Sequence, residues 1–316
     1  MTDRAAGGPP NDHLDLLDGL IYADGFDCAV TLDELWRYAR VAIERDALTG
    51  RLAEDVVLRE LVVERDGLYC LADRAELLEL RPRRIAHARR LQRRAQRVAR
   101  VLRLLPFVRD LALTGSSAAG NAGESADVDL LVVVAARRLG IVFAMLGPLS
   151  RVLGRRVFCP NYYLSETRLD FQPGNLYVAH ELAQACMLTE ESRLISAANP
   201  WVATFFPNLN WPVQPVPVLR SRSRLQRTLE APLRGEVGDR LERAARRLAA
   251  TRLRAHYGDL GHDVPAGTVE SLEAGLALRF HGLHLEHDLL GRYAARRARV
   301  ADRLRQVEEI PTSRPV

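Results

Sequence analysis

The pattern that most restricts the fold is a pair of aspartates followed at once by an unbroken apolar run. Asp127 and Asp129 are alternate residues, and residues 130–134 read LLVVV. Alternate side chains of a strand project from the same face, so the two carboxylates would lie close together. A short apolar run without alternation is typical of a strand buried on both faces. The pattern predicts an α/β (α+β) chain in which a buried strand begins with two acids.

Small residues precede the two aspartates. Residues 114–123 read TGSSAAGNAG and follow a β-rich run that begins at residue 108. Glycine allows a close backbone approach, and free N–H groups at a helix start bind phosphate. Carboxylate oxygens suit Mg²⁺, and two such ions can activate a hydroxyl and neutralise a leaving pyrophosphate. The stretch therefore predicts a site for magnesium and a nucleoside triphosphate.

This stretch resembles the nucleotidyltransferase superfamily typified by DNA polymerase β, in particular its kanamycin-nucleotidyltransferase and minimal-nucleotidyltransferase branch. The branch has the pattern Gly-Ser-x-Ala-x-Gly-x-Ala, three variable residues, then Ser-Asp-x-Asp-Leu. The matching residues are Gly115, Ser116, Ala118, Gly120, Ala122, Asp127, Asp129 and Leu130. Ala126 replaces the serine before the first aspartate. The resemblance implies that Asp127 and Asp129 are catalytic metal ligands. It also implies a set of nucleotide contacts: Gly115, Ser116, Ser117, Gly120 and Asn121.

A third carboxylate from a neighbouring later strand is part of the same family pattern. In this chain the later strand reads VFCPNYYLSE, residues 157–166, and Asn161 stands where an aspartate is expected. An asparagine carbonyl can bind a metal but cannot take a proton. Two alternatives follow. Either Glu166 or Asp170 supplies the charge from just beyond the strand, or the site binds nucleotide and catalyses poorly.

Two classes of function are consistent with these residues. The first is an enzyme that transfers a nucleoside monophosphate from a magnesium nucleoside triphosphate to a hydroxyl, on a small molecule, a protein or RNA, with release of pyrophosphate. The second is a nucleotide-sensing regulatory or interaction module that has lost most of its catalysis. In a predicted helix at 174–188, Tyr177 and His180 are candidates for the border of the acceptor pocket, and the other apolar residues are assigned to core packing.

The absence of lysine narrows the chemistry further. All 45 basic residues are arginine, and the net charge is +5. A Walker P-loop and a Schiff-base mechanism both need lysine and are excluded.

The hydrophobic content is 47%, and no apolar run approaches the roughly 20 residues of a membrane span. We expect a cytoplasmic protein without a membrane segment, in which the four separated cysteines are buried thiols.

The N-terminal region resembles a winged helix-turn-helix domain. Three helical patterns, at residues 13–22, 31–44 and 50–61, precede two strand-like runs around Asp66-Gly67, a strong hairpin signal. Thr31 and Glu34 have the spacing of a capping box at the start of the second helix. The third helical pattern, residues 50–61, mixes arginine with glutamate and aspartate, whereas a DNA-reading helix is normally basic. A structural or protein-contacting role is therefore favoured over operator binding.

An arginine-rich helix follows at residues 81–103. It holds ten arginines and no acid, while apolar residues recur at helical spacing. Its basic face is either solvated or contacts a nucleic-acid or protein partner. The predicted organisation is a leader (1–12), a winged-helix-like domain (13–80), a nucleotidyltransferase-like domain (81–215), a helical C-terminal region (216–308) and a tail (309–316).

Overall fold

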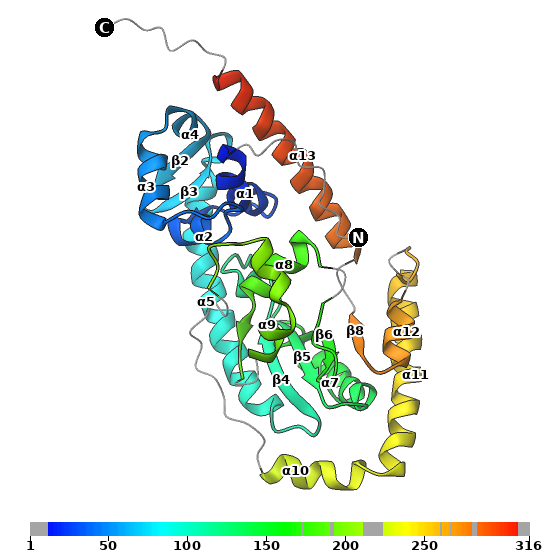
Figure 1. The fold of residues 1–316 in the computed structure, drawn as a ribbon. Helices are drawn as coiled ribbons and strands as arrows, with labels where there is room; N and C mark the ends of the chain where they lie inside the picture. Colours follow the sequence, from blue (N-terminus) through cyan, green and yellow to red (C-terminus); the bar gives the residue numbers. More distant parts are fainter. Residues whose placement is uncertain are drawn as a thin grey trace, which may run out of the picture. The chain divides into compact units, whose positions relative to one another are not determined.

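A computed structural model describes residues 12–171, 174–189, 193–210, 224–259, 261–265, 267–279 and 283–308. Contacts between residues group the described chain into two units, shown in Figure 1. The first contains residues 12–83, 201–210 and 287–308, and the second contains residues 84–200 and 224–286. The first unit combines segments from three of the domains predicted from the sequence. The predicted domain ranges therefore remain predictions.

The first unit is a set of short helices around a three-stranded antiparallel sheet of order β1-β3-β2. Its elements up to residue 71 are α1 (Asp12–Asp24), β1 (Val30–Thr31), α2 (Leu32–Arg37), α3 (Arg45–Glu54), α4 (Val56–Leu61), β2 (Val62–Arg65) and β3 (Leu68–Leu71). The hairpin expected at Asp66-Gly67 is confirmed, and both residues have positive φ, 54° and 74°. A winged-helix assignment for this unit stays a prediction.

Two expected helices of this unit have different bounds. The helix expected over residues 31–44 ends at Arg37, although the capping box between Thr31 and Glu34 that starts it is present. The helix expected over residues 50–61 is divided at Asp55. The Asp55 side chain accepts hydrogen bonds from the backbone N–H groups of Val57 and Leu58, so it caps a second helix. Hydrophobic spacing alone did not reveal this internal cap.

Segments from the C-terminal half complete the first unit. Val300 and Leu304 of α13 (Leu283–Glu308) lie in the same hydrophobic cluster as α1. Tyr293 of this helix donates a hydrogen bond to Asp18, which is fully buried in α1. In residues 201–210, the Asn208 amide donates to the carbonyl of Trp36. These long-range contacts have no local sequence signature.

The second unit is built on a mixed five-stranded sheet of order β7-β4-β5-β6-β8. The strands are β4 (Val108–Leu113), β5 (Asp129–Val134), β6 (Cys159–Ser165), β7 (Cys186–Met187) and β8 (Ala277–Arg279). β5 and β6 are parallel, and the other pairs are antiparallel. Strand β8, orange in Figure 1, pairs with β6 although they are far apart in the sequence. The predicted mixed α/β architecture is confirmed.

Helices surround this sheet. They are α5 (Leu77–Leu102), which begins in the first unit, α6 (Gly115–Ala118), α7 (Leu139–Leu153), α8 (Leu176–Gln184), α9 (Arg193–Ala198), α10 (Arg224–Glu230), α11 (Glu236–Asp259) and α12 (Thr268–Glu273). The apolar face expected for the arginine-rich helix is confirmed, since Ala88, Leu91 and Ala95 of α5 are buried. None of the described helices is long and apolar enough to cross a membrane.

Two edge strands were not expected. The predicted helix at 174–188 ends at Gln184 and is followed by β7, and the predicted helical C-terminal region also contains β8. Both strands are two or three residues long, so they have little periodicity of their own. Pairing with the existing sheet supplies the hydrogen bonds that make them strands. The four cysteines are free and buried, as expected.

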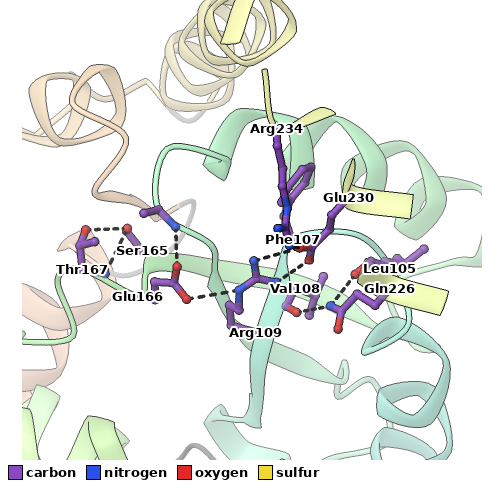
Figure 2. Close-up of polar contacts among 11 residues, drawn as sticks. Leu105, Phe107, Val108, Arg109, Ser165, Glu166, Thr167, Gln226, Glu230 and Arg234 are labelled. Atoms are coloured by element: carbon purple, nitrogen blue, oxygen red, sulfur yellow. Dashed lines mark hydrogen bonds and ion pairs between the residues drawn. The ribbon is translucent and has the colours of Figure 1, made fainter. Parts of the chain in front are cut away.

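A buried carboxylate ties α10 to the start of β4. Figure 2 shows Glu230, which is fully buried, between Arg109 at 2.6 Å and Arg234 at 2.8 Å. The backbone N–H of Phe107 also donates to Glu230, at 2.9 Å. Burial by itself would raise the pKa of Glu230, but these three donors lower that pKa to about 2. The carboxylate is therefore fully satisfied in its charged form.

We predict that Glu230→Gln lowers the free energy of unfolding by about 1 to 3 kcal/mol, because the buried Arg109 and the Phe107 N–H lose a charged acceptor while Glu166 remains a carboxylate partner of Arg109. Since the folded pKa of Glu230 lies below its ordinary 4.5, its contribution is present above pH 4.5 and is lost as the pH falls toward 2. Urea denaturation at pH 7 and pH 3 measures both effects. Glu236→Gln removes an exposed pair with Arg240 and should change little.

Candidate active site

The two aspartates lie at the start of β5, next to the turn that leaves β4. Leu113 of β4 pairs with Leu130 of β5, and the backbone N–H of Thr114 donates to the carbonyl of Asp129 at 2.9 Å. The antiparallel register therefore brings the first residues of α6, Gly115 and Ser116, beside the two acids. The predicted first strand, glycine turn and second strand are present, but β5 begins at Asp129, so Asp127 lies two residues before the strand.

Gly115 makes the closest approach to the acids. Its φ is +68°, a conformation that favours glycine, and a Cβ at this position would lie 3.1 Å from Oδ2 of Asp129. Ser116 is exposed beside it. Gly115 and Ser116 therefore place the start of α6 next to a carboxylate, as expected of a phosphate-binding turn beside metal ligands.

The other predicted nucleotide contacts hold the loop together. The Ser117 hydroxyl donates to the carbonyl of Asp127 at 2.8 Å, which fixes the backbone of the first acid. The N–H of Asn121 donates to the carbonyl of Ser116, and the Asn121 side chain accepts from Arg84 at 3.2 Å. Gly120 has φ +70° and closes the turn. These contacts stabilise the conformation of the loop. That Ser117, Gly120 and Asn121 contact the nucleotide stays a prediction.

The charges at the aspartate pair are only partly compensated. Nε of Arg155 lies 3.1 Å from Oδ2 of Asp127. Burial raises the pKa of Asp129 to about 6, and the charge of Asp127 adds to the rise, while Arg155 and Cys159 oppose it. An added cation would therefore be favourable at this pair, because it would remove the repulsion between the two carboxylates.

Glu166 does not lie with the aspartates. In the parallel register Asp129 pairs with Cys159 and Val134 pairs with Ser165, so Glu166 follows the opposite end of β6. Figure 2 shows its carboxylate bound to Arg109, at 3.2 Å, and it also accepts from the N–H of Ala136. The assignment of Glu166 as a catalytic acid is corrected on this geometry. Asp170 lies farther along the chain and forms an exposed pair with Arg168, at 3.7 Å.

Asn161 lies at an irregularity in β6. Leu130 pairs with Pro160 and Leu131 with Tyr162, so the register passes over Asn161. Its side chain lines a cavity together with Tyr163. The sequence position of Asn161 suggested that it replaces the third acid. The bulge that removes Asn161 from the regular strand pairing has no signal in the sequence.

Glu181 is the acid that the sequence analysis missed. It lies on α8, which packs against α6, and the backbone N–H of Gly115 favours the charged form of its carboxylate and so lowers its pKa. Burial raises the pKa of Glu181 to about 7; the charge of Asp129 adds to the rise, and Arg279 opposes it. Arg279 also stacks on Tyr177 with 6.0 Å between the guanidinium carbon and the ring centroid. His180, the other candidate border residue, is buried.

No local pattern could have identified Glu181. It lies within a mainly apolar helix, and only the packing of α8 on the glycine turn brings it to Asp129. Among the described residues, no three histidine, cysteine, aspartate or glutamate side chains lie close enough together to hold one metal ion. Glu181 therefore adjoins the aspartate pair without forming a three-ligand cluster with it.

Comparison with known protein families agrees with this geometry. Residues 96–176 match the family of nucleotidyltransferase domains. The matched segment contains β4, the glycine turn, both aspartates and β6, so the chain contains a nucleotidyltransferase domain of the polymerase β-like superfamily. No curated protein and no solved structure matches the chain. The general reaction of such a domain is the transfer of a nucleoside monophosphate.

We predict that Gly115→Ala destabilises the protein by about 1 to 2 kcal/mol, because alanine is strained at φ +68° and its Cβ would press on Asp129. The matched control is Gly123→Ala in the same loop, where a Cβ would meet no atom within 4 Å. Thermal unfolding of the two variants measures the difference. Equal unfolding temperatures would show that the turn does not need glycine.

Proposed function

We propose that this protein is a nucleotidyltransferase that moves a nucleoside monophosphate from a magnesium nucleoside triphosphate to a hydroxyl acceptor. The observation that carries the proposal is the close approach of Gly115 to Asp129, which places the glycine turn beside one of the paired carboxylates. Backbone N–H groups bind phosphate, and carboxylates bind the metal that accompanies it. The family match at residues 96–176 supports the same reaction class.

The residues at the site fit magnesium. Asp127 and Asp129 offer hard oxygen ligands, and the raised pKa of Asp129 reports the unfavourable charge that a cation would offset. When bound, Mg²⁺ would supply charge neutralisation at the phosphates and at the attacking oxygen. Arg155 holds Asp127 in place from the other side.

The proposed reaction forms one O–P bond and breaks another. The acceptor oxygen attacks the α-phosphorus, and a new O–P bond forms. The bond between the α-phosphorus and the bridging oxygen breaks, and pyrophosphate leaves with the electron pair. The acceptor proton passes to a carboxylate, for which we propose Glu181. Its position on the glycine turn and its electrostatic contact with Asp129 support this role.

A second candidate function is nucleotide sensing without transfer. The observation that favours it is the influence of the Gly115 N–H on the pKa of Glu181, which indicates a carboxylate beside a donor that a phosphate could use. The arginines of α5 would then contact a nucleic-acid or protein partner. A cytoplasmic location belongs with both candidates as a prediction.

Incubation with each labelled nucleoside triphosphate and Mg²⁺ separates the two candidates. We expect pyrophosphate release in the presence of an acceptor mixture, and we expect Asp127→Ala and Asp129→Ala each to abolish metal-dependent nucleotide binding. Calorimetry follows the binding. Nucleotide binding by the wild type with no pyrophosphate from any nucleotide would favour sensing, and unchanged binding in the two alanine variants would refute the site.

We predict that Glu181→Gln lowers the rate of transfer by about 10² to 10⁴-fold, the usual contribution of a general base, and leaves nucleotide affinity within about threefold. Pyrophosphate release and calorimetry measure the two quantities on one preparation. The matched control is Asp170→Asn, which removes an exposed acid that lies beyond β6. A slower Asp170→Asn and an unaffected Glu181→Gln would reverse the assignment.

A further inference from the structure

A cavity of about 210 Å³ lies among α7, α11 and the first half of β6, within the second unit. Apolar side chains form part of its wall, in particular Phe143, Pro148, Pro160 and Leu248. A cavity of about 150 Å³ holds one benzene molecule, so this space accommodates a body of about one aromatic ring. The function described so far does not use it.

Two buried oxygen atoms of residues in the wall have no partner. Oδ1 of Asn161 and the hydroxyl of Tyr163 make no hydrogen bond within the described part of the chain. Tyr163 is fully buried, and its ring packs edge-on against Phe143 at 5.9 Å. Both oxygens are covered by protein atoms, so Asn161 and Tyr163 shape the wall of the cavity without turning these two atoms toward it.

The charge around the cavity is positive. Arg151 and Arg252 line it, and neither forms an ion pair with any described residue. Arg155 lines it too, and none of the described lining residues is acidic. A carboxylate or phosphate would be attracted to this wall, and a cationic molecule would be repelled.

The cavity reaches the aspartate pair through a shared wall. Cys159 and Arg155 both line the cavity. Arg155 is paired with Asp127, and Cys159 lies opposite Asp129 in the sheet register. Neither aspartate lines the cavity, so a ligand in it would be separated from the two carboxylates by the side chains of Arg155 and Cys159, one residue away from the place where the reacting hydroxyl is required.

We propose that this cavity binds the acceptor, and that the acceptor is a hydroxylated organic anion with a body of about one ring. The proposal rests on the proposed transfer reaction and specifies its acceptor. The anionic group binds at Arg151 and Arg252, and the apolar body lies against Phe143 and Leu248. The hydroxyl oxygen forms the new bond to the α-phosphorus of the nucleoside triphosphate, loses its proton to the carboxylate base, and pyrophosphate leaves.

Binding of p-hydroxymethylbenzoate tests the cavity without nucleotide or metal. Saturation-transfer NMR and calorimetry on the full chain are the measurements, with p-aminomethylbenzyl alcohol as the cationic comparator. We expect the anion to bind and the cation to bind at least about tenfold more weakly, since a charge-assisted contact would be lost. Equal binding of the two compounds, or no binding of the anion, would overturn the proposal.

Three variants locate the binding. Gly147→Leu fills the cavity from α7 and should abolish binding of the anion, and Arg252→Gln should weaken it about tenfold. The matched control is Arg254→Gln, an exposed arginine of α11 that does not line the cavity, and it should bind as the wild type does. Unchanged binding in both Gly147→Leu and Arg252→Gln refutes the site.

Two further results separate this proposal from the proposed function. Binding of the anion in the cavity without pyrophosphate release from any nucleotide would support the ligand site and refute the transfer reaction. Pyrophosphate release that depends on RNA or protein, and that Gly147→Leu leaves unchanged, would support the transfer reaction and refute the cavity as the acceptor site.

Discussion

The contact between Gly115 and Asp129 is the constraint on which the candidate site depends. Antiparallel pairing of β4 with β5 places the end of one strand against the start of the other, and glycine is favoured there because φ is positive and a Cβ would crowd Asp129. The turn and the acids are therefore a single structural unit. Ser117 strengthens it by bonding the backbone of Asp127. The pairing of β4 with β5 therefore holds the glycine turn and the carboxylates of the candidate site together.

The two ends of the β5–β6 pair differ in their electrostatics. At one end, hydrogen bonds lower the pKa of buried Glu230 to about 2, and Arg109 joins it to Glu166. At the other end, burial raises the pKa of Asp129 to about 6 and that of Glu181 to about 7. Satisfied charges stabilise the fold, whereas charges left partly uncompensated are suited to binding a cation. This contrast separates the structural end of the sheet from the functional end.

The sequence predicted the parts of the site that are local. Residues 114–134 specify a turn and a strand by their own composition, and the family match covers the same stretch. The third acid was different, because Asn161, Glu166 and Asp170 were chosen by their distance along the chain. The parallel register directs Glu166 to the far end of the sheet, and helix α8 brings Glu181 to the turn instead. Distance in sequence does not define distance across a sheet.

The sequence by itself determined the glycine turn, the paired aspartates, the apolar strand after them and the apolar face of α5, since each is set by residues within a few positions of one another. Tertiary structure alone decided three things: the short edge strands β7 and β8, the inclusion of α13 in the first unit, and the approach of Glu181 to Asp129. The physical reason is that these features depend on hydrogen bonds and burial supplied by distant segments, whose positions are fixed only when the whole core forms.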